Sequence, residues 1–434
     1  MNLFLPNPGR FYKALFLAAL FLEMFFQPGR PHAQTGSVTP VHDPCIIKSE
    51  GYYYIFNTAN RISIRRSADL NSWQYLGSVF TSLPAWGVAE VPGVSNIWAP
   101  DIFYHNGTYY LYYSLSTFGS NRSRIGLATN TTLDRANPDY NWVDQGKVYE
   151  SNPGQSNFNA IDPNVARDAS GRFWLSFGSF WSGIKLVELD STTFKPAPNS
   201  RLYSIASRPG STAIEAPYIV YKDGYYYLFV SFDLCCQGVN STYRIMVGRS
   251  AQITGAYRDK NGAPLSSGGG SQVLAGFGRW RGPGHCAVLL EEDASWLVYH
   301  AYDAQNNGTP TLRINRLYWD QDGWPTLDET SVVEQKGGTA APGEYVLYQN
   351  YPNPFNPNTA IRYQLSAVSD VRLMIYDVLG RPVRTLVDTR QQAGSHQVIW
   401  AGVDEQNLPA AAGVYFCRLV AGEFSQVIKL ALLR

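Results

Sequence analysis

A short pattern that recurs five times is the feature of this chain that most restricts its fold. Each copy begins with a small or acidic residue near a proline, continues through an apolar run and a Gly or Asn/Asp turn, and ends in an aromatic segment. The copies span residues 42–56, 98–114, 161–179, 215–231 and, in degraded form, 284–300. Tight turns such as HNG and KDG between two β-rich runs indicate a hairpin in each copy.

The spacing of the copies predicts how these hairpins are arranged. The turns fall at residues 51, 107, 171, 224 and 295, so the steps between them are 56, 64, 53 and 71 residues. Each step is long enough for a four-stranded sheet, and no convincing amphipathic helix interrupts residues 41–334. Radial repetition leaves only short, protected sheet edges. We therefore expect an all-β fold, with a five-bladed β-propeller over residues 34–333 rather than a sandwich.

The charge balance argues against a nucleic-acid partner. The chain has 35 basic and 34 acidic residues, a net charge of +1, and no long basic block that would bind phosphates. Aromatic residues make up 14% of the chain, with 29 Tyr and 11 Trp. This content fits a β-rich protein with stacking surfaces, which can bind sugars but also build ordinary cores.

The N-terminus has the features of an export signal. Arg10 and Lys13 precede the apolar run ALFLAALFLEMFF at residues 14–26, and a cleavage site follows Ala33. The alternative is a membrane anchor, but thirteen residues interrupted by Glu23 are too few to span a bilayer. We expect a signal peptide at residues 1–33, no transmembrane segment in the mature chain, and a protein that is secreted or held at the outer cell surface.

Three carboxylates are predicted to meet at the axis of the propeller. Aligning the prolines of the first four copies gives Asp43, Ala99, Asp162 and Ala216 equivalent positions, with Glu215 one residue earlier. An Asp-Pro pair alone is more often a turn. Turn formation does not explain Glu215 just ahead of the fourth proline, however. Because equivalent strand starts face one axis, a shared acidic site is the better interpretation.

Such a set of carboxyl groups suits glycosidic bond cleavage, which needs one protonated and one ionised carboxyl group. Glu215 has apolar neighbours, so desolvation should raise its pKa and make it the acid. Asp43, beside the polar His42, is the better base. Asp162 is placed to keep the proton on Glu215 through like-charge repulsion and to hold that side chain in position.

These motifs resemble glycoside hydrolase family 43. The resemblance rests on VHDP, NIWAPD, NAIDPN, IEAP and GPGH, in this order over residues 41–325, and is strongest to the endo-1,5-α-L-arabinanases of the family. It implies a five-bladed propeller that hydrolyses arabinan with inversion. It also implies that Asp43 is the general base, Glu215 the general acid and Asp162 the modulator of the pKa of that acid.

The resemblance also indicates substrate-binding and metal-binding residues. It implies sugar contacts at Gly119, Asn159, Ser179, Phe180 and Trp181. We add Trp98, which takes the place of Glu215 in its own copy, and Phe118; core packing is the alternative for each aromatic. The GPGH segment implies a weakly held calcium ion near His285, because calcium prefers oxygen ligands and one imidazole is a poor substitute. We expect no organic cofactor.

The cysteines point away from a disulfide framework or a zinc site, since five are irregularly spaced and none forms CxxC. The adjacent Cys235 and Cys236 form either a vicinal disulfide, which we favour, or two thiols. The segment CCQGVNSTYRIMVGRS at residues 235–250 resembles the arabinanase branch of the family. Two related propeller families that retain configuration are disfavoured, because the chain lacks their WMNDPNG-like segment.

The composition changes at residues 334–345, where Gly, Pro and small residues indicate a linker. Residues 346–434 alternate strands and turns, which predicts a small C-terminal β-sandwich. Its YPNPFNP, DVLGR and GVYF elements resemble the sorting domains of type IX secretion, which implies the type IX secretion machinery as a partner. The alternative is an accessory carbohydrate-binding sandwich.

Two rival functions stay open at this stage. An exo-acting α-L-arabinofuranosidase or β-xylosidase would use the same propeller but release only terminal sugars. A non-catalytic, surface-displayed glycan-binding propeller would bind arabinan without cleaving it, although the three carboxylates argue against this.

Overall fold

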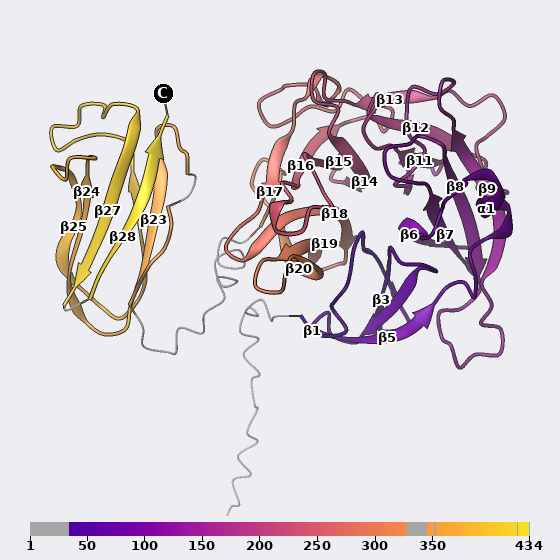
Figure 1. Cartoon of the computed structure of the whole chain (residues 1–434), viewed down its shortest axis with the longest axis horizontal. Coiled ribbons are helices and arrows are strands. Elements are labelled where there is room, and N and C mark those ends of the chain that lie inside the picture. The colour runs from indigo at the N-terminus through magenta and orange to yellow at the C-terminus, as the bar shows by residue number, and fades with distance from the viewer. Residues whose placement is uncertain (1–33, 328–344, 351–352, 423, 434) are drawn as a thin grey trace, which may run out of the picture. The chain divides into compact units, whose positions relative to one another are not determined.

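The computed structural model describes residues 34–327, 345–350, 353–422 and 424–433, and the chain divides near residue 337 into two compact units (Figure 1). The predicted signal peptide and most of the predicted linker lie outside the described residues. The exact domain boundaries therefore stay predictions. Within the part of the chain that is described, no helix has the length and apolar character needed to cross a bilayer.

Five antiparallel sheets follow one another along the first unit. The first has β1 (Thr35–Gly36), β2 (Cys45–Ser49), β3 (Tyr52–Asn57), β4 (Ser63–Ser67) and β5 (Ser72–Ser78). The second has β6 (Trp98–His105), β7 (Thr108–Leu115), β8 (Ser123–Asn130) and β9 (Val143–Ser151), and the third β10 (Asn164–Arg167), β11 (Phe173–Phe177), β12 (Ile184–Leu189) and β13 (Tyr203–Ala206). The fourth has β14 (Ile214–Lys222), β15 (Tyr225–Phe232), β16 (Arg244–Ser250) and β17 (Ser271–Leu274), and the fifth β18 (Trp280–Leu290), β19 (Ser295–Asp303), β20 (Thr309–Trp319) and β21 (Pro325–Leu327).

The sheets form a ring. The first strands of successive sheets contact one another in the order β2, β6, β10, β14, β18 and back to β2. Figure 1 shows three of them, β6, β14 and β18, around a central axis. The ring closes between the fifth sheet and the segment before the first, where Val41 N–H donates to Pro310 O at 2.9 Å and Leu312 N–H to Val38 O at 2.9 Å. This is the arrangement of a five-bladed propeller, and the all-β prediction is confirmed.

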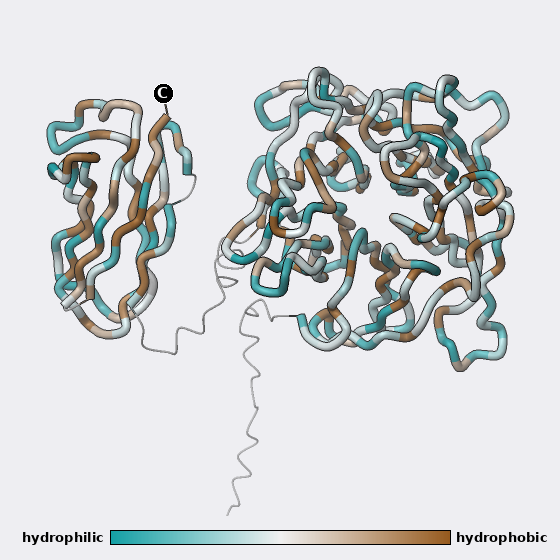
Figure 2. The backbone as a smooth tube through the Cα atoms, in the orientation of Figure 1, coloured by the Kyte–Doolittle hydropathy of each residue, from teal (hydrophilic) through white to brown (hydrophobic). Residues whose placement is uncertain are grey.

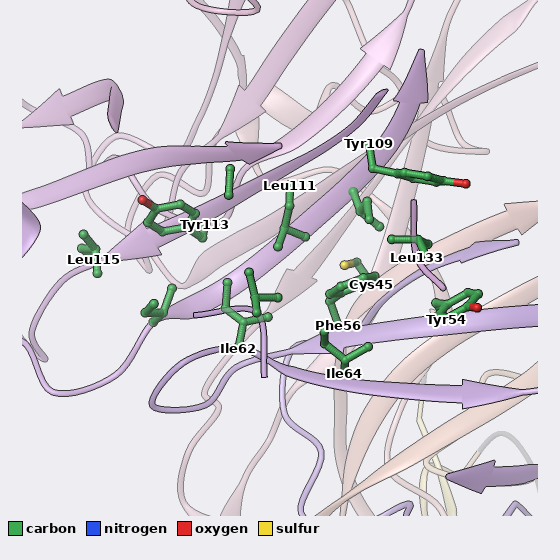
Figure 3. Close-up of a cluster of buried hydrophobic side chains, with 14 of the residues drawn as sticks. Cys45, Tyr54, Phe56, Ile62, Ile64, Tyr109, Leu111, Tyr113, Leu115 and Leu133 are labelled. Carbon is green, nitrogen blue, oxygen red and sulfur yellow. The ribbon is translucent and has the colours of Figure 1, made fainter. Parts of the chain in front are cut away.

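A hydrophobic cluster fills each gap between neighbouring sheets. Figure 3 shows the cluster between the first and second sheets, where Phe56 and Ile64 pack with Leu111 and Leu115. Four further clusters join the second sheet to the third, the third to the fourth, the fourth to the fifth and the fifth to the first. Burial of apolar surface on both faces of every sheet is thus what holds the ring together.

Two local features differ from the expectation of five plain four-stranded sheets. The two-residue strand β1 pairs in parallel with β5 and adds a fifth strand to the first sheet. A short helix, α1 (Ala85–Glu90), packs through Trp86 against the cluster between the first two sheets. Two 3-10 turns, η1 (Gly238–Asn240) and η2 (Leu265–Ser267), lie in the fourth sheet's loops.

The second unit consists of two sheets around one hydrophobic cluster. One has β22 (Val346–Leu347), β23 (Thr359–Leu365) and β26 (Gly394–Trp400); the other has β24 (Ser369–Tyr376), β25 (Pro382–Gln391), β27 (Gly413–Ala421) and β28 (Phe424–Leu432). Hydrophobic and hydrophilic positions alternate along its strands (Figure 2), and every second residue of β23 is buried. This period of two places one face of each sheet in a shared core.

Candidate active site

One unusual backbone conformation recurs at the start of the inner strand of every sheet. Five residues at equivalent positions have a left-handed φ between 47° and 58°: Asp43, Ala99, Asp162, Ala216 and His285. In the second, fourth and fifth sheets the strand register shifts at this point. A bulge of this kind re-aims the neighbouring side chains in these three sheets, and the left-handed residue stands at the equivalent position in all five.

The backbone N–H of each left-handed residue is held by a side chain from another sheet. In four cases the acceptor stands at one equivalent position, next to the second strand of the preceding sheet. These bonds run from Ala99 to Thr58 Oγ1 (2.8 Å), from Asp162 to Ser114 Oγ (3.1 Å), from His285 to Ser231 Oγ (2.8 Å) and from Asp43 to His300 Nδ1 (3.1 Å). Hydrogen bonds between neighbouring sheets therefore hold these left-handed residues in place.

The fifth case brings a carboxylate into this ring. The equivalent residue of the third sheet is Gly178, which has φ 135° and no room for a side chain, because an added Cβ would lie 2.6 Å from Gly183 O. The missing acceptor is replaced by Asp162, whose Oδ2 accepts the Ala216 N–H at 3.1 Å. Asp162 thus holds the backbone beside Glu215.

A cavity of about 1100 Å³ opens at this ring. It is lined by all the residues that the sequence placed in the site: Asp43, Trp98, Phe118, Gly119, Asn159, Asp162, Ser179, Phe180, Trp181, Glu215 and His285. The three carboxyl groups come from the first, third and fourth sheets, and each residue is at most 8% exposed. The structure therefore gathers the predicted residues in one place, while their individual roles stay predictions.

Asp43 is surrounded by imidazoles. Its Oδ1 lies 2.8 Å from His42 Nδ1, 3.2 Å from His285 Nδ1 and 3.7 Å from His300 Nδ1, and its Oδ2 accepts a hydrogen bond from Thr58 Oγ1 at 2.6 Å. Burial alone would raise the pKa of Asp43, but these imidazoles outweigh it and hold the pKa well below its ordinary value. Asp43 is therefore ionised at neutral pH.

Glu215 is held by two hydroxyl groups. Ser179 Oγ donates to Glu215 Oε2 at 2.5 Å, and Tyr243 Oη contacts Oε1. Burial raises the pKa of Glu215 to about 7; the Ser179 hydrogen bond and the charge of His42 lower it, and the charge of Asp43 raises it. Glu215 therefore keeps a proton in mildly acidic solution, as a general acid requires.

Asp162 has carboxylates rather than cations as neighbours. Burial raises its pKa, the negative charges of Glu215 and Asp43 raise it further, and the bond from the Ala216 N–H lowers it. Burial and mutual repulsion together keep a proton on the Asp162–Glu215 pair. The site thus holds two kinds of carboxyl group side by side: the Asp162–Glu215 pair, which keeps a proton, and the ionised Asp43.

Comparison with known proteins identifies the family that shares this arrangement. The sequence model of glycosyl hydrolases family 43 matches residues 38–325. The chain belongs to glycoside hydrolase family 43.

Three relatives show how close the similarity is. The chain is 47% identical to the extracellular endo-α-(1→5)-L-arabinanase 1 of Bacillus subtilis over 66% of its length and 87% of the relative. It is 44% identical to the extracellular exo-α-(1→5)-L-arabinofuranosidase ArbA of Cellvibrio japonicus, over 67% and 86%. The structure of a Cellvibrio cellulosa α-L-arabinanase complexed with arabinohexaose aligns with a TM-score of 0.67 at 42% identity, over 68% and 98%. The chain is a glycoside hydrolase, and its residues 356–423 match the FlgD Ig-like domain.

Aromatic side chains form part of the cavity wall of this family 43 site. The rings of Trp98 and Phe118 lie 5.1 Å apart, and Phe118 is 78% exposed. Phe180 and Trp181 both have a left-handed φ, and Trp181 is 38% exposed. Core packing, the alternative for each aromatic, does not account for Phe118 or Trp181, since their rings are open to the cavity.

Hydrogen bonds and strand pairing hold some of the polar residues that line the cavity. Asn159 is buried, and its Oδ1 accepts a hydrogen bond from Ser123 Oγ at 2.6 Å. Ser179 pairs with Glu215 across an isolated bridge. Gly119 has φ 74° and open space where a side chain would stand. These contacts make the floor of the site rigid near the carboxyl groups.

His285 is the predicted metal ligand, and the carboxylate beside it is that of Asp43, with Oδ1 3.2 Å from His285 Nδ1. Burial lowers the pKa of His285, so its imidazole is neutral and able to act as a ligand. A second grouping, His42, Asp43 and His300, has ligand atoms within 4.8 Å of one another. There, His300 Nδ1 already accepts the Asp43 N–H. His285 is the better candidate, and water would have to complete the coordination of any calcium ion.

Several residues of the site escaped the sequence analysis. Thr58, Ser114 and Ser231 each lie seven residues after the turn glycine of their copy, so the repeat carried a signal that was not used. His300 ends its copy as Ser114 and Ser231 end theirs, although the fifth copy has lost its turn glycine, and Tyr302 lies beyond the copy. Tyr243 and the linked pair Cys235–Cys236, which the structure joins in a disulfide, lay within a quoted motif.

Proposed function

We propose that this protein hydrolyses α-1,5-L-arabinofuranosidic bonds in arabinan with inversion at the anomeric carbon. The observation that carries the proposal is the single cavity in which an ionised Asp43 and a protonated Glu215 face the same space. The endo-acting and exo-acting relatives, and the relative whose structure contains arabinohexaose, support arabinan as the substrate.

The reaction follows from the two protonation states. Asp43 accepts a proton from a water molecule as the oxygen of that water attacks the anomeric carbon. Glu215 donates its proton to the departing glycosidic oxygen, so that the bond breaks with a neutral leaving group. Asp162 favours the protonated form of Glu215 and holds the Ala216 N–H beside it. Trp98, Phe118 and Trp181 offer ring faces to the sugars.

The test is a product analysis with linear arabinan and the Glu215→Gln variant. Inversion predicts that proton NMR, recorded within the first minutes, shows the β-anomer of the new reducing end before mutarotation. Loss of hydrolysis with arabinan binding retained is expected for the variant. A variant that turns over at the wild-type rate would remove Glu215 from this role.

We infer endo action over exo action, on the stronger identity to the endo-acting relative. Endo action predicts mixed oligosaccharides early in the digestion of linear arabinan, whereas release of arabinose alone would establish the exo-acting alternative. Binding of arabinan without any release of reducing ends would favour the non-catalytic glycan-binding propeller.

We also propose that His285 holds a calcium ion whose remaining ligands are water molecules. When bound, the ion would organise water near the carboxyl groups. Elemental analysis should find calcium in the wild-type protein and not in His285→Ala, and a chelator should lower the thermal stability of the former only.

Export is the last part of the proposal. The apolar N-terminal run, the extracellular relatives and the C-terminal YPNPFNP, DVLGR and GVYF elements support a secreted or surface-attached enzyme that uses type IX secretion. Deletion of residues 346–434 should leave the enzyme active but retain it inside a cell that has this machinery.

A further inference from the structure

A chain of hydrogen bonds connects Asp43 to a loop of the fourth sheet. His42 Nδ1 lies 2.8 Å from Asp43 Oδ1, and His42 Nε2 lies 2.7 Å from Tyr302 Oη. The Tyr302 hydroxyl in turn accepts the backbone N–H of Cys236 at 2.8 Å. Three sheets thus contribute one contact each: His42 precedes β2, Tyr302 stands on β19, and Cys236 follows β15.

Further contacts fix the ring of His42. It stacks on the buried imidazole of His300, with centroids 4.0 Å apart and planes 24° apart. Cys236 Sγ lies 3.7 Å from His42 Nε2. Stacking therefore holds the plane of the His42 ring, and the contacts of its two nitrogens hold the ring's orientation within that plane. Both of these nitrogens are engaged, one by Asp43 and one by Tyr302.

The outer end of the chain is a covalently restricted turn. Cys235 and Cys236 are joined by a disulfide, and Cys236 has φ 65°, a left-handed conformation that few residues adopt without support. A bond between adjacent side chains closes a small ring that limits the rotation of this peptide. The backbone N–H of Cys236 in this turn is the group that donates to Tyr302 Oη.

We propose that the Cys235–Cys236 turn, Tyr302 and His42 form a hydrogen-bonded chain that holds the general base Asp43 in its working position. Tyr302 and His42 are then positioning residues for the hydrolysis. This inference rests on the proposed function, because it assigns Asp43 the role of base. A base must present one oxygen to the attacking water, and small displacements of catalytic groups lower kcat strongly.

The matched pair of variants is Tyr302→Phe and Tyr299→Phe. Both tyrosines lie on β19 and are buried. Tyr299→Phe removes a hydroxyl hydrogen bond to Asn315 Oδ1 at 2.7 Å, and Tyr302→Phe removes the two hydrogen bonds with His42 and Cys236. Tyr302→Phe should lower kcat on linear arabinan about 10-fold with KM changed less than about twofold. Tyr299→Phe should leave both constants at the wild-type values. Equal losses of kcat in the two variants would overturn the proposal.

Reduction of the disulfide gives a second, independent test of the proposal. A dithiol such as dithiothreitol passes two electrons and two protons to Cys235–Cys236 and becomes a cyclic disulfide itself, leaving two protein thiols. The other three cysteines are free and buried, so no other disulfide is available. Reduction should lower kcat in the wild type and in Tyr299→Phe, with no further loss in Tyr302→Phe. Additive losses in Tyr302→Phe would contradict a shared chain.

A spectroscopic measurement separates this inference from the proposed function. Two-bond 1H–15N correlation spectra of the histidine rings, at one pH, should show the His42 nitrogens shifted in Tyr302→Phe and unchanged in Tyr299→Phe. Failure of the wild type to cleave arabinan would refute the proposed function, while this shift would still establish the chain. Unshifted His42 nitrogens in Tyr302→Phe would refute the chain, whatever the activity.

Discussion

Asp43 and Asp162 occupy the same backbone position in two different sheets, yet the pKa values of their carboxyl groups are shifted in opposite directions. Both have a left-handed φ, at 50° and 58°, and they are 8% and 6% exposed. The pKa of Asp43 lies below its ordinary value and that of Asp162 above it. The repeated fold therefore supplies position and burial, while the neighbouring side chains decide the charge.

The difference arises from what each adjoining sheet contributes. Asp43 is placed among His42, His285 and His300, and its interactions with these imidazoles outweigh the effect of burial on its pKa. Asp162 is placed beside Glu215, so burial strengthens a repulsion instead. A ring of five sheets can in this way give two carboxyl groups at one repeated backbone position opposite pKa shifts.

The largest expected effect comes from removing the proposed acid, Glu215, or the proposed base, Asp43. Glu215→Gln and Asp43→Asn should each lower kcat on arabinan by about 10³-fold or more. A substrate with a good leaving group, such as 4-nitrophenyl α-L-arabinofuranoside, distinguishes them. Glu215→Gln should recover activity on it because the leaving group needs no proton, and Asp43→Asn should not. Recovery by both variants, or by Asp43→Asn alone, would reverse or abolish the assignment.

Asp162→Asn should have the next largest effect. The variant removes the carboxyl group that is coupled to Glu215 and could ionise beside it, so the pKa of Glu215 should fall, the alkaline limb of the kcat profile should move to lower pH, and kcat should drop about 10²-fold. Asp101→Asn is the control. Asp101 is also buried with a raised pKa of about 7, but it accepts bonds from Asn164 and Val165 and does not line the cavity. An equal shift of the limb in both variants would show a general effect of buried charge.

The fold and the position of the site were more predictable than the protonation of its carboxyl groups. The five copies fixed the number and order of the sheets, since each hairpin is local in sequence. The proline alignment placed Asp43 and Asp162 at equivalent positions for the same reason. Protonation depends on contacts between residues far apart in the sequence, such as those of Asp43 with His300 and of Glu215 with Tyr243, and local patterns carry little information on these contacts.

Stability should depend on pH in opposite ways at the two carboxyl groups. The pKa of Glu215 is raised from 4.5 to about 7, so its contribution to stability is fully present below about 4.5 and is lost as the pH rises through about 7. The loss is at most about 3 kcal/mol. Asp43, with its lowered pKa, contributes stability above its unfolded value that is lost only in strong acid. Chemical denaturation between pH 4.5 and 7.5 should therefore show the wild type losing stability relative to Glu215→Gln; parallel curves would contradict the raised pKa.

The smallest expected effect tests the acid through its hydrogen bond alone. Ser179→Ala removes the donor to Glu215 Oε2, a bond that lowers the pKa of Glu215. The pKa should therefore rise, and the alkaline limb of the kcat profile should move to higher pH, opposite to Asp162→Asn. Because Tyr243 still contacts the other oxygen, the plateau value of kcat should stay within about threefold of wild type. Ser182→Ala, a nearby hydroxyl that has no hydrogen-bond partner in the described residues, should leave the limb in place. Shifts of the same sign in Ser179→Ala and Asp162→Asn would mean that geometry, and not charge, controls the proton on Glu215.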